Sequence, residues 1–410
     1  MKIVEITTYY QSYIDKFYKS NPELINESYK KQLERLYYDS FGWSDFWIRA
    51  MSPMGYEMQK IILNVRPLQK AWADENQSGD LVDLNDWNAI GLRQIKKFKP
   101  DVILYDHHDA TFLKAIKKDV PSVKLVISWS GSAIYKSDVW NAVDVILSCA
   151  PEAVEYFKAN GHKNVFHLNH GFDPIVNERL QAGSKKIKLT FIGQLMRQKD
   201  FHIKREYILE EFVRKLDFDI NIFSPNEEFI SFYSDLEFFL RNCFYKSMKV
   251  LKSFGISEKA LALIPKIGKA ALWKEAPVAP VSPILKKYIK PGVFGLQMYQ
   301  IIKNSWATLN IHADSSPRFA SNMRLFEVTG VGCCLVTDWR PNIAELFEPD
   351  YEIVTYKSIG ECVEKVQWLL NNPKELGKIS IAGMIRCRKD HSFAERAKLL
   401  DSYIKKGLGR

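Results

Sequence analysis

The amino-acid sequence predicts an α/β protein with two consecutive domains, each built on a parallel sheet. Short runs of β-branched residues alternate with longer helical patterns over most of the chain, which is typical of repeated βαβ units. The runs are almost continuously apolar, as expected of strands covered by helices on both faces. A chain of 410 residues with 46% hydrophobic content is too long for one ordinary core. We therefore expect two domains.

The first half contains five candidate strands and one clear helix. Pro151 suits the first turn of a helix and Gly161 suits its end, so a helix is expected between them. A polar stretch at 171–186 contains Gly and Pro without sustained periodicity, and we interpret it as a linker. The expected strands are 2–7, 101–106, 124–129, 144–149 and 164–169.

The alternation restarts after the linker and ends in a further helix. A long helical stretch at about 225–280 is crowded with Phe and Tyr, and such an aromatic stripe usually packs into a core. A helix is expected at 205–216, with strands at 187–193, 218–223, 307–313, 333–338 and 351–356. The expected domains are 1–175 and 187–390, with a helical, aromatic and basic insertion at about 225–292 and a C-terminal helix at 391–410.

The cysteines and the N-terminus indicate a cytoplasmic protein. Six cysteines are scattered without C-x-x-C spacing, and most lie in apolar stretches where a free thiol behaves as a small hydrophobe. The first 20 residues lack the apolar core of a signal peptide. No window approaches the roughly 18 to 20 apolar residues that cross a bilayer.

The formal charge of +10 is compatible with nucleic acid, an anionic membrane surface or a small anionic ligand as partner. Much of this charge is local, because the stretch 265–292 has six lysines and a single glutamate. A solvated loop is the simpler interpretation of that stretch. Contact with an anionic lipid or polymer is the alternative, which would place the protein at the inner face of a membrane.

The stretch "NMRLFEVTGVGCCLVTD" at 322–338 places a charged pair before a buried run. It predicts a helix that ends at Gly330 and Gly332 and leads into a strand. Arg324 and Glu327 are three residues apart and share one helix face. A surface ion pair is one interpretation. If the face lies in a cleft, the carboxylate can instead accept two hydrogen bonds from a vicinal diol such as a ribose.

The same stretch, with the roughly 60 residues that follow its start, resembles the C-terminal domain of group 1, family-4-like glycosyltransferases. Within that group it is most similar to the CgeB-type, spore-maturation-like branch, with its Asn-x-Arg-x-Phe-Glu motif followed by Gly and a strand. The resemblance implies a GT-B arrangement, in which two Rossmann-like domains face a central cleft that holds a nucleotide sugar. It also implies that Asn322, Arg324 and Glu327 bind the donor, with Glu327 on the ribose.

The resemblance extends to other donor-binding positions, with two departures. Gly193 matches a glycine that approaches the donor diphosphate, and Lys199 matches a lysine six residues later. The family's arginine directly after that glycine is Gln194 here, so Arg197 or Arg205 is a candidate substitute. A second family glutamate is replaced by Phe319, and Asp314 is one of the nearest charged residues.

The segment "DVILYDHHDATF" places His107 and His108 at the carboxyl end of a strand. Four consecutive residues of a strand end seldom surround one metal ion, because neighbouring side chains diverge. In the resembling family a histidine near this strand end faces the donor sugar, which makes either histidine a candidate for positioning or proton transfer. The alternative is a loop histidine without a catalytic part. The Asp-x-Asp at 217–219 lies at the start of a strand, so we expect no catalytic metal and no cofactor.

These residues lead to one main hypothesis and two alternatives. The main one is a glycosyltransferase that moves a sugar from a nucleoside-diphosphate donor to a hydroxyl of a glycan, lipid-linked or protein acceptor, with retention implied by the family. A nucleotide-sugar-binding protein without turnover is the second. A nucleic-acid-binding protein is a distant third, because no nucleic-acid module is recognisable, and we expect no nucleic-acid partner.

Overall fold

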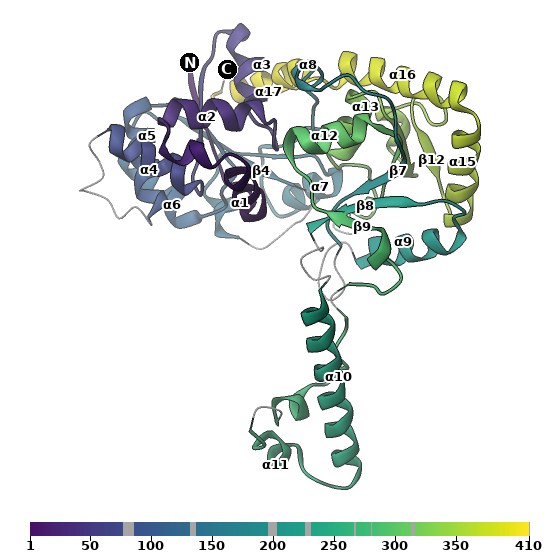
Figure 1. The fold of residues 1–410 in the computed structure, drawn as a ribbon. Coiled ribbons are helices and arrows are strands. Elements are labelled where there is room, and N and C mark those ends of the chain that lie inside the picture. The colour runs from purple at the N-terminus through teal and green to yellow at the C-terminus, as the bar shows by residue number, and fades with distance from the viewer. Residues whose placement is uncertain are drawn as a thin grey trace. The chain divides into compact units, whose positions relative to one another are not determined.

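The computed structural model describes residues 1–76, 86–131, 137–195, 203–225, 231–265, 268–279, 281–312 and 316–409. Arg197, Lys199 and Asp314, all candidates for the site, lie outside these ranges. The chain divides into two compact units (Figure 1). Unit 1 comprises 1–189 and 294–410, and unit 2 comprises 190–293. The domain limits expected from the sequence remain predictions.

The first sheet has six strands in the order β2-β1-β3-β4-β5-β6. All of its neighbouring strands are parallel, and β1 lies between its partners with Ile3 opposite Met58 on one side and Val102 on the other. Parallel strands need long crossovers, which explains the helix after most strands. The strands are β1 Lys2–Thr7, β2 Glu57–Ile62, β3 Val102–Tyr105, β4 Leu125–Ser130, β5 Val145–Ser148 and β6 Val165–His167.

Helices cover this sheet on both faces, and the core lies between them and the strands. One cluster packs α5, α6 and α7 against β1, β3, β4 and β5, and another packs α1, α2 and α4 around the ends of β1 and β2. The helices are α1 Gln11–Ser20, α2 Tyr29–Tyr38, α3 Phe46–Met51, α4 Arg66–Glu75, α5 Trp87–Phe98, α6 Ala110–Asp119 and α7 Pro151–Ala159.

The second sheet also has six strands, in the order β12-β11-β10-β7-β8-β9. The pairs β10 with β11, β11 with β12 and β8 with β9 are parallel. The strands are β7 Ile187–Ile192, β8 Ile220–Ser224, β9 Ile289–Pro291, β10 Ser305–Asn310, β11 Cys334–Asp338 and β12 Val354–Tyr356. The helices are α8 Ile175–Arg179, α9 Ile203–Lys215, α10 Phe232–Ser253, α11 Glu258–Ala262, α12 Gly295–Lys303, α13 Arg324–Gly330, α14 Ile343–Leu346, α15 Ile359–Asn371, α16 Pro373–Asp390 and α17 Phe393–Gly407.

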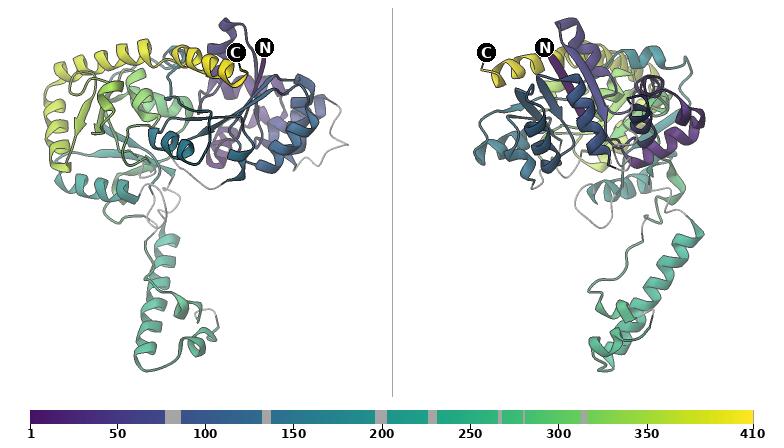
Figure 2. Two further views of the ribbon diagram at one scale, coloured as in Figure 1. Left: turned by 180° about the vertical axis from the view of Figure 1, so that it is seen from behind. Right: turned by 90° about the vertical axis from the view of Figure 1, so that its left-hand side faces the viewer.

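The last helix, α17, returns to the first sheet, so the two chain ends lie close together (Figures 1 and 2). The Tyr403 hydroxyl donates to the His167 carbonyl at 2.9 Å, and its ring stacks on Phe166 at a centroid distance of 4.5 Å. This helix, Phe393–Gly407, lies within the range 391–410 where the sequence predicted a C-terminal helix.

All ten strands expected from the sequence are present, with limits that differ by up to three residues. Two strands, β2 and β9, were not expected. The run "EMQKII" of β2 contains Lys60, and "IKP" of β9 spans three residues in the lysine-rich stretch. A lysine inside a strand usually argues against burial, yet Lys60 is 1% exposed.

A buried ion pair explains why Lys60 can lie in β2. Its Nζ atom is 2.9 Å from Glu5 Oε1 on the neighbouring strand and donates to the Ser44 carbonyl at 2.6 Å. Burial lowers the pKa of Lys60, but the Glu5 carboxylate, together with smaller effects of Tyr9 and Asp106, raises it overall. Each charge is therefore held in the core by the other.

The aromatic insertion helix α10 departs from expectation on one of its sides. Phe244, Met248 and Leu251 pack with α11 and the turn Gly268–Leu272 in a small core, as the aromatic stripe predicts. Phe239 on another side is 61% exposed. Within the ranges that the structure describes, no helix is long and apolar enough to cross a membrane.

Replacing Lys60 with Met should destabilise unit 1, because it leaves the Glu5 carboxylate buried and unpaired. We expect a loss of about 3–5 kcal/mol in the free energy of unfolding, measured by urea denaturation. The double variant Glu5→Leu/Lys60→Met should recover most of that loss, because apolar side chains of similar size replace the pair. A double variant as unstable as Lys60→Met would show that the pair is not the source of the effect.

Candidate functional site

The carboxylate of Glu327 is held by two neighbouring side chains at the start of α13. Arg324 Nη1 donates to Glu327 Oε2 at 2.7 Å, and the Tyr299 hydroxyl donates to Oε1 at 3.4 Å. The Glu327 side chain is 9% exposed and that of Arg324 18%. Burial, followed by the nearby Glu327 charge, raises the pKa of Tyr299 well above its usual value. The pair is therefore buried rather than a surface ion pair, and each carboxylate oxygen keeps a further lone pair.

Two glycines fix the far end of this helix. The ring of Phe172 lies against Gly330, and a Cβ atom there would be 2.3 Å from that ring, so only glycine fits. Gly332 has φ of +79°, a left-handed conformation that lets the chain leave α13 and enter β11. The sequence pattern predicted that the helix ends at these two glycines.

Asn322 joins the loop before α13 to the ends of two strands. Its Nδ2 donates to Asn310 Oδ1 at 2.7 Å, and Asn310 Nδ2 donates to Thr337 Oγ1 at 2.9 Å. Asn310 ends β10 and Thr337 lies near the end of β11. Asn322 therefore positions α13, and with it Glu327, at the carboxyl edge of the sheet.

Sequence reasoning missed a buried His–Asp pair at the same edge. Asp338 Oδ1 lies 2.7 Å from His312 Nδ1, and Arg340 Nη2 donates to Oδ2 at 2.7 Å. Burial favours the neutral acid, but His312 and Arg340 outweigh it and lower the pKa of Asp338 to about 2. His312 Nε2 is buried and has no partner among the described residues. The signal was available, since Asp338 is the last residue of β11 and His312 lies two residues after β10.

Asp106 directly follows β3 in the first sheet. The Thr7 hydroxyl donates to Asp106 Oδ2 at 3.2 Å. Burial, with a smaller effect of the Glu5 charge, raises the pKa of Asp106 to about 7. The charges of Asp106 and Glu327 both act on the hydroxyl of Tyr10. Loss of hydration at its hydroxyl, then the charges of Asp106 and Glu327, raise the pKa of Tyr10 although 71% of the residue is exposed. In unit 1, Asp106 and Glu327 thus act on the same hydroxyl.

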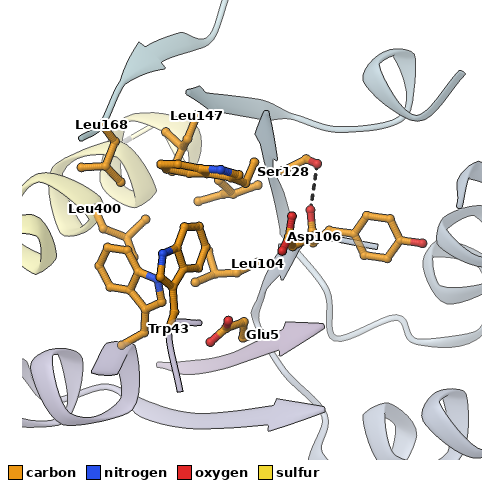
Figure 3. Close-up of a pocket in the computed structure, with 12 residues that line it drawn as sticks. Glu5, Trp43, Leu104, Asp106, Ser128, Leu147, Leu168 and Leu400 are labelled. Carbon is orange, nitrogen blue, oxygen red and sulfur yellow. Dashed lines mark hydrogen bonds between the residues drawn. The ribbon is translucent and has the colours of Figure 1, made fainter. Parts of the chain in front are cut away.

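A cavity of about 20 Å³ lies behind Asp106 (Figure 3). Figure 3 shows Glu5, Trp43, Leu104 and Asp106 around it. Its size suits about one water molecule, since a water needs roughly 10–15 Å³ of such space. Glu5 Oε2 is buried without a partner among the described residues, so a water there has an acceptor to bind. The cavity can therefore hold a water molecule that hydrates the carboxyl groups, and it is too small for a substrate.

The two histidines after β3 have different surroundings. His108 has φ of +59°, and its Nε2 is 2.9 Å from the Trp129 carbonyl oxygen, which makes that nitrogen a donor. His107 lies 4.0 Å from Asp109 Oδ2, and its Nε2 is buried without a hydrogen-bond partner among the described residues. Burial lowers the pKa of both histidines. Both are therefore neutral near pH 7 and can accept a proton only weakly.

Glu152 in the first turn of α7 binds the loop that follows β10. Its Oε1 accepts hydrogen bonds from the backbone N–H groups of Arg318 and Phe319 at 2.8 and 2.9 Å, and its Oε2 accepts one from the Ser316 hydroxyl at 3.0 Å. Phe319, at the position of the family's missing glutamate, is thus placed by its backbone. No sequence pattern indicated this contact, which joins residues 167 positions apart.

A cavity of about 500 Å³ lies beside this contact, within the range of ligand pockets. Its wall includes Phe319, Asn169, Glu155 and Glu345. Asn169 Oδ1 is buried and accepts no hydrogen bond from a described residue. The guanidinium of Arg396 already makes hydrogen bonds within the protein, since it donates to His391 Nδ1 at 2.7 Å and to the His170 carbonyl at 2.9 Å. The remaining polar atoms are mostly acceptors, which suits a ligand rich in hydroxyl groups.

In unit 2, two expected donor residues lie close together. Gly193 directly follows β7, and its N–H donates to the Phe223 carbonyl at 3.1 Å. A Cβ atom on Gly193 would lie 3.2 Å from the Phe191 ring and 3.6 Å from Arg205 Nη1. The guanidinium of Arg205 therefore lies beside the backbone of Gly193.

Among the described residues, no three His, Cys, Asp or Glu side chains are arranged to hold a metal ion. The six cysteines are free thiols, five of them buried. The absence of a catalytic metal and of a cofactor stays a prediction.

Residues 258–402 match the family model described as glycosyl transferase-like. No curated protein matches the chain.

Solved structures with a similar fold cover nearly the whole chain. HepE of Anabaena, solved with UDP and glucose, has a TM-score of 0.53 at 10% identity and covers 99% of this chain and 100% of its own. An alpha-glucosyltransferase, solved with UDP-glucose and DNA containing an abasic site, has a TM-score of 0.57 at 11% identity with the same coverage. Sucrose-phosphate synthase of Thermosynechococcus elongatus has a TM-score of 0.53 at 7% identity and covers 99% of both chains. The chain therefore has the GT-B fold of two Rossmann-like domains, and its C-terminal segment 258–402 matches the glycosyl transferase-like family.

Proposed function

We propose that the protein is a glycosyltransferase that transfers a sugar from a nucleoside-diphosphate donor to a hydroxyl acceptor. The observation that carries the proposal is the buried carboxylate of Glu327, which Arg324 and Tyr299 hold at the start of α13. A fixed carboxylate with spare lone pairs accepts hydrogen bonds from the two hydroxyls of a ribose. HepE and the alpha-glucosyltransferase were solved with UDP or UDP-glucose, so UDP-sugars are the donors to test first.

Cationic groups of the chain supply the electrostatic part of the proposed reaction. Negative charge develops on the departing diphosphate in the transition state, and fixed cations stabilise it most where water is excluded. We assign this role to Lys199 and Arg205, together with the backbone at Gly193. Arg324 is less suited, because its guanidinium is already bonded to Glu327. No metal is needed in this scheme.

Asp106, His107 and His108 are the proposed groups for positioning and proton transfer. The acceptor hydroxyl must lose a proton, and a group with a pKa near the working pH transfers it best. Asp106 meets that condition with its pKa of about 7. His108 is more suited to positioning, because its Nε2 already donates to the Trp129 carbonyl.

The cavity of about 500 Å³ is the proposed place of a hydroxyl-rich acceptor. Retention of configuration belongs to the proposal through the family resemblance. Incubation with a UDP-sugar and candidate glycan acceptors, followed by NMR of the anomeric proton, tests both transfer and its stereochemistry. A glycosidic product with the donor's anomeric configuration supports the proposal, and an inverted product contradicts retention alone.

Binding without turnover is a second candidate function. The contact of Glu152 with the Arg318 and Phe319 amides favours it, because a carboxylate of the protein occupies backbone donors beside the candidate site. Donor binding in the absence of product or of donor hydrolysis would identify this function. Absence of both donor binding and product would contradict both candidate functions.

Glu327→Gln should weaken nucleotide binding, because the amide removes a charged acceptor for the ribose hydroxyls. Hydrogen bonds to charged groups contribute about 1.5–3 kcal/mol, so the affinity for UDP should fall about 10- to 100-fold. Isothermal titration calorimetry measures the change. Glu364→Gln is the matched control, because Glu364 is exposed on α15, and its affinity should equal that of the wild type. Equal affinity of Glu327→Gln and Glu364→Gln would contradict the assignment.

Asp106 should make stability depend on pH. Its pKa of about 7 in the folded protein exceeds its ordinary value of 3.8, so the folded state binds this proton more tightly. Its contribution to stability is therefore full below about pH 4 and is lost as pH rises through about 7. Urea denaturation from pH 4 to 8 should show that the free energy of unfolding of the wild type falls relative to that of Asp106→Asn, because the amide stays neutral over this window. A pH-independent difference would contradict the raised pKa.

A further inference from the structure

The helix α10 carries an uncovered apolar stripe. Leu236, Phe239 and Leu240 form one apolar group near the start of α10, and Val250 and the C-cap residue Phe254 form a second group on the same side at its end. Their exposed fractions are 42%, 61%, 42%, 54% and 78%. Single exposed apolar residues are common on proteins, but two groups of large apolar residues on one helix side within 19 residues indicate an interaction surface.

The stripe is not an extension of the local core. Phe244, Met248 and Leu251, on another side of α10, pack with Leu261 and Ala271. That contact satisfies one apolar side and fixes α11 beside α10 (Figure 2). Exposed Leu263 and Leu272 of the neighbouring turns add further uncovered apolar surface. The segment 231–279 therefore exposes much of its apolar surface after its own core has formed.

A lysine borders the stripe, and the segment around it has net positive charge in its sequence. Lys246 follows Phe239 by seven residues and precedes Val250 by four, so it borders the stripe on α10. The segment 231–279 contains eight Lys and Arg residues against four Asp and Glu residues. The basic residues are Arg241, Lys246, Lys249, Lys252, Lys259, Lys266, Lys269 and Lys274.

We propose that the α10 stripe, Leu236 to Phe254, docks on a membrane surface that contains anionic lipids. A helix with large apolar residues on one side and lysines beside them lies in the plane of the lipid interface. The lysine stems can lie along the apolar surface while their amino groups reach the lipid phosphates. Pairing with a second copy is disfavoured, because it would bring two segments of the same net positive charge together.

This docking surface goes beyond the proposed transfer reaction and does not depend on it. It lies in unit 2 and includes none of the candidate site residues. Nucleotide binding and vesicle binding can therefore fail independently, and each experiment reports on its own proposal.

The test is sedimentation of the full chain with vesicles of phosphatidylcholine, with and without phosphatidylglycerol. The variant Phe239→Gln/Phe254→Gln removes two large side chains of the stripe, and its partition coefficient should fall at least about tenfold. The variant Lys246→Gln/Lys249→Gln should lose about fivefold for each charge on anionic vesicles. High salt should weaken wild-type binding to anionic vesicles.

The matched control is Ile381→Gln/Ile385→Gln, which removes two exposed apolar residues, 56% and 58% exposed, from α16. This variant should bind vesicles as the wild type does. Thermal unfolding of all variants should match that of the wild type, because every substituted side chain is exposed.

Three results would overturn the proposal. The first is absence of sedimentation with anionic vesicles, and the second is an equal loss in the α16 control. The third is a dimer in solution, measured by light scattering, that the Phe239→Gln/Phe254→Gln substitutions dissociate. That third result would assign the stripe to a second copy of the chain.

Discussion

The buried carboxylate of Glu327 is the feature on which the functional interpretation depends. A carboxylate loses hydration when it is buried, and Arg324 at 2.7 Å compensates for that loss with a charged hydrogen bond. Tyr299 binds the other oxygen, so the group has one orientation before any ligand arrives. Such preorganisation lowers the cost of binding a diol, because the acceptor atoms need not be ordered again.

The fold places the Glu327 carboxylate at the carboxyl edge of a parallel sheet. In parallel sheets, polar side chains that follow strands gather at one edge, and Asp106, Asn310 and Asp338 all lie at strand ends. Glu327 and Asp106 come from opposite halves of the sequence, yet both carboxylates act on Tyr10. Glu152 adds a second connection between distant segments through the amides of the loop after β10. Unit 1 thus combines the groups that we propose to bind the ligand with the groups that we propose to move a proton.

Much of the fold could be predicted because alternating apolar runs specify parallel strands almost directly. The strands that escaped prediction break this rule locally. In β2, Lys60 is stabilised by Glu5, 55 residues away in the sequence, and such pairing over distance has no local pattern. The local motif Asn-x-Arg-x-Phe-Glu located Glu327, and the structure supplied its partner Tyr299. The contacts of Glu152 and Tyr10 depend on the folded chain and could not be predicted from spacing. For α10, periodicity predicted an apolar side that packs into a core. It could not show that a second apolar side stays exposed.

A structure of the protein crystallised with UDP tests the central claim most directly. The account predicts that the two ribose hydroxyls lie within hydrogen-bond distance, about 2.5–3.2 Å, of the Glu327 carboxylate oxygens. It also predicts that Arg324 and Tyr299 keep their contacts to the same carboxylate. A nucleotide bound elsewhere, or a ribose that leaves Glu327 bonded only to Arg324 and Tyr299, would contradict it.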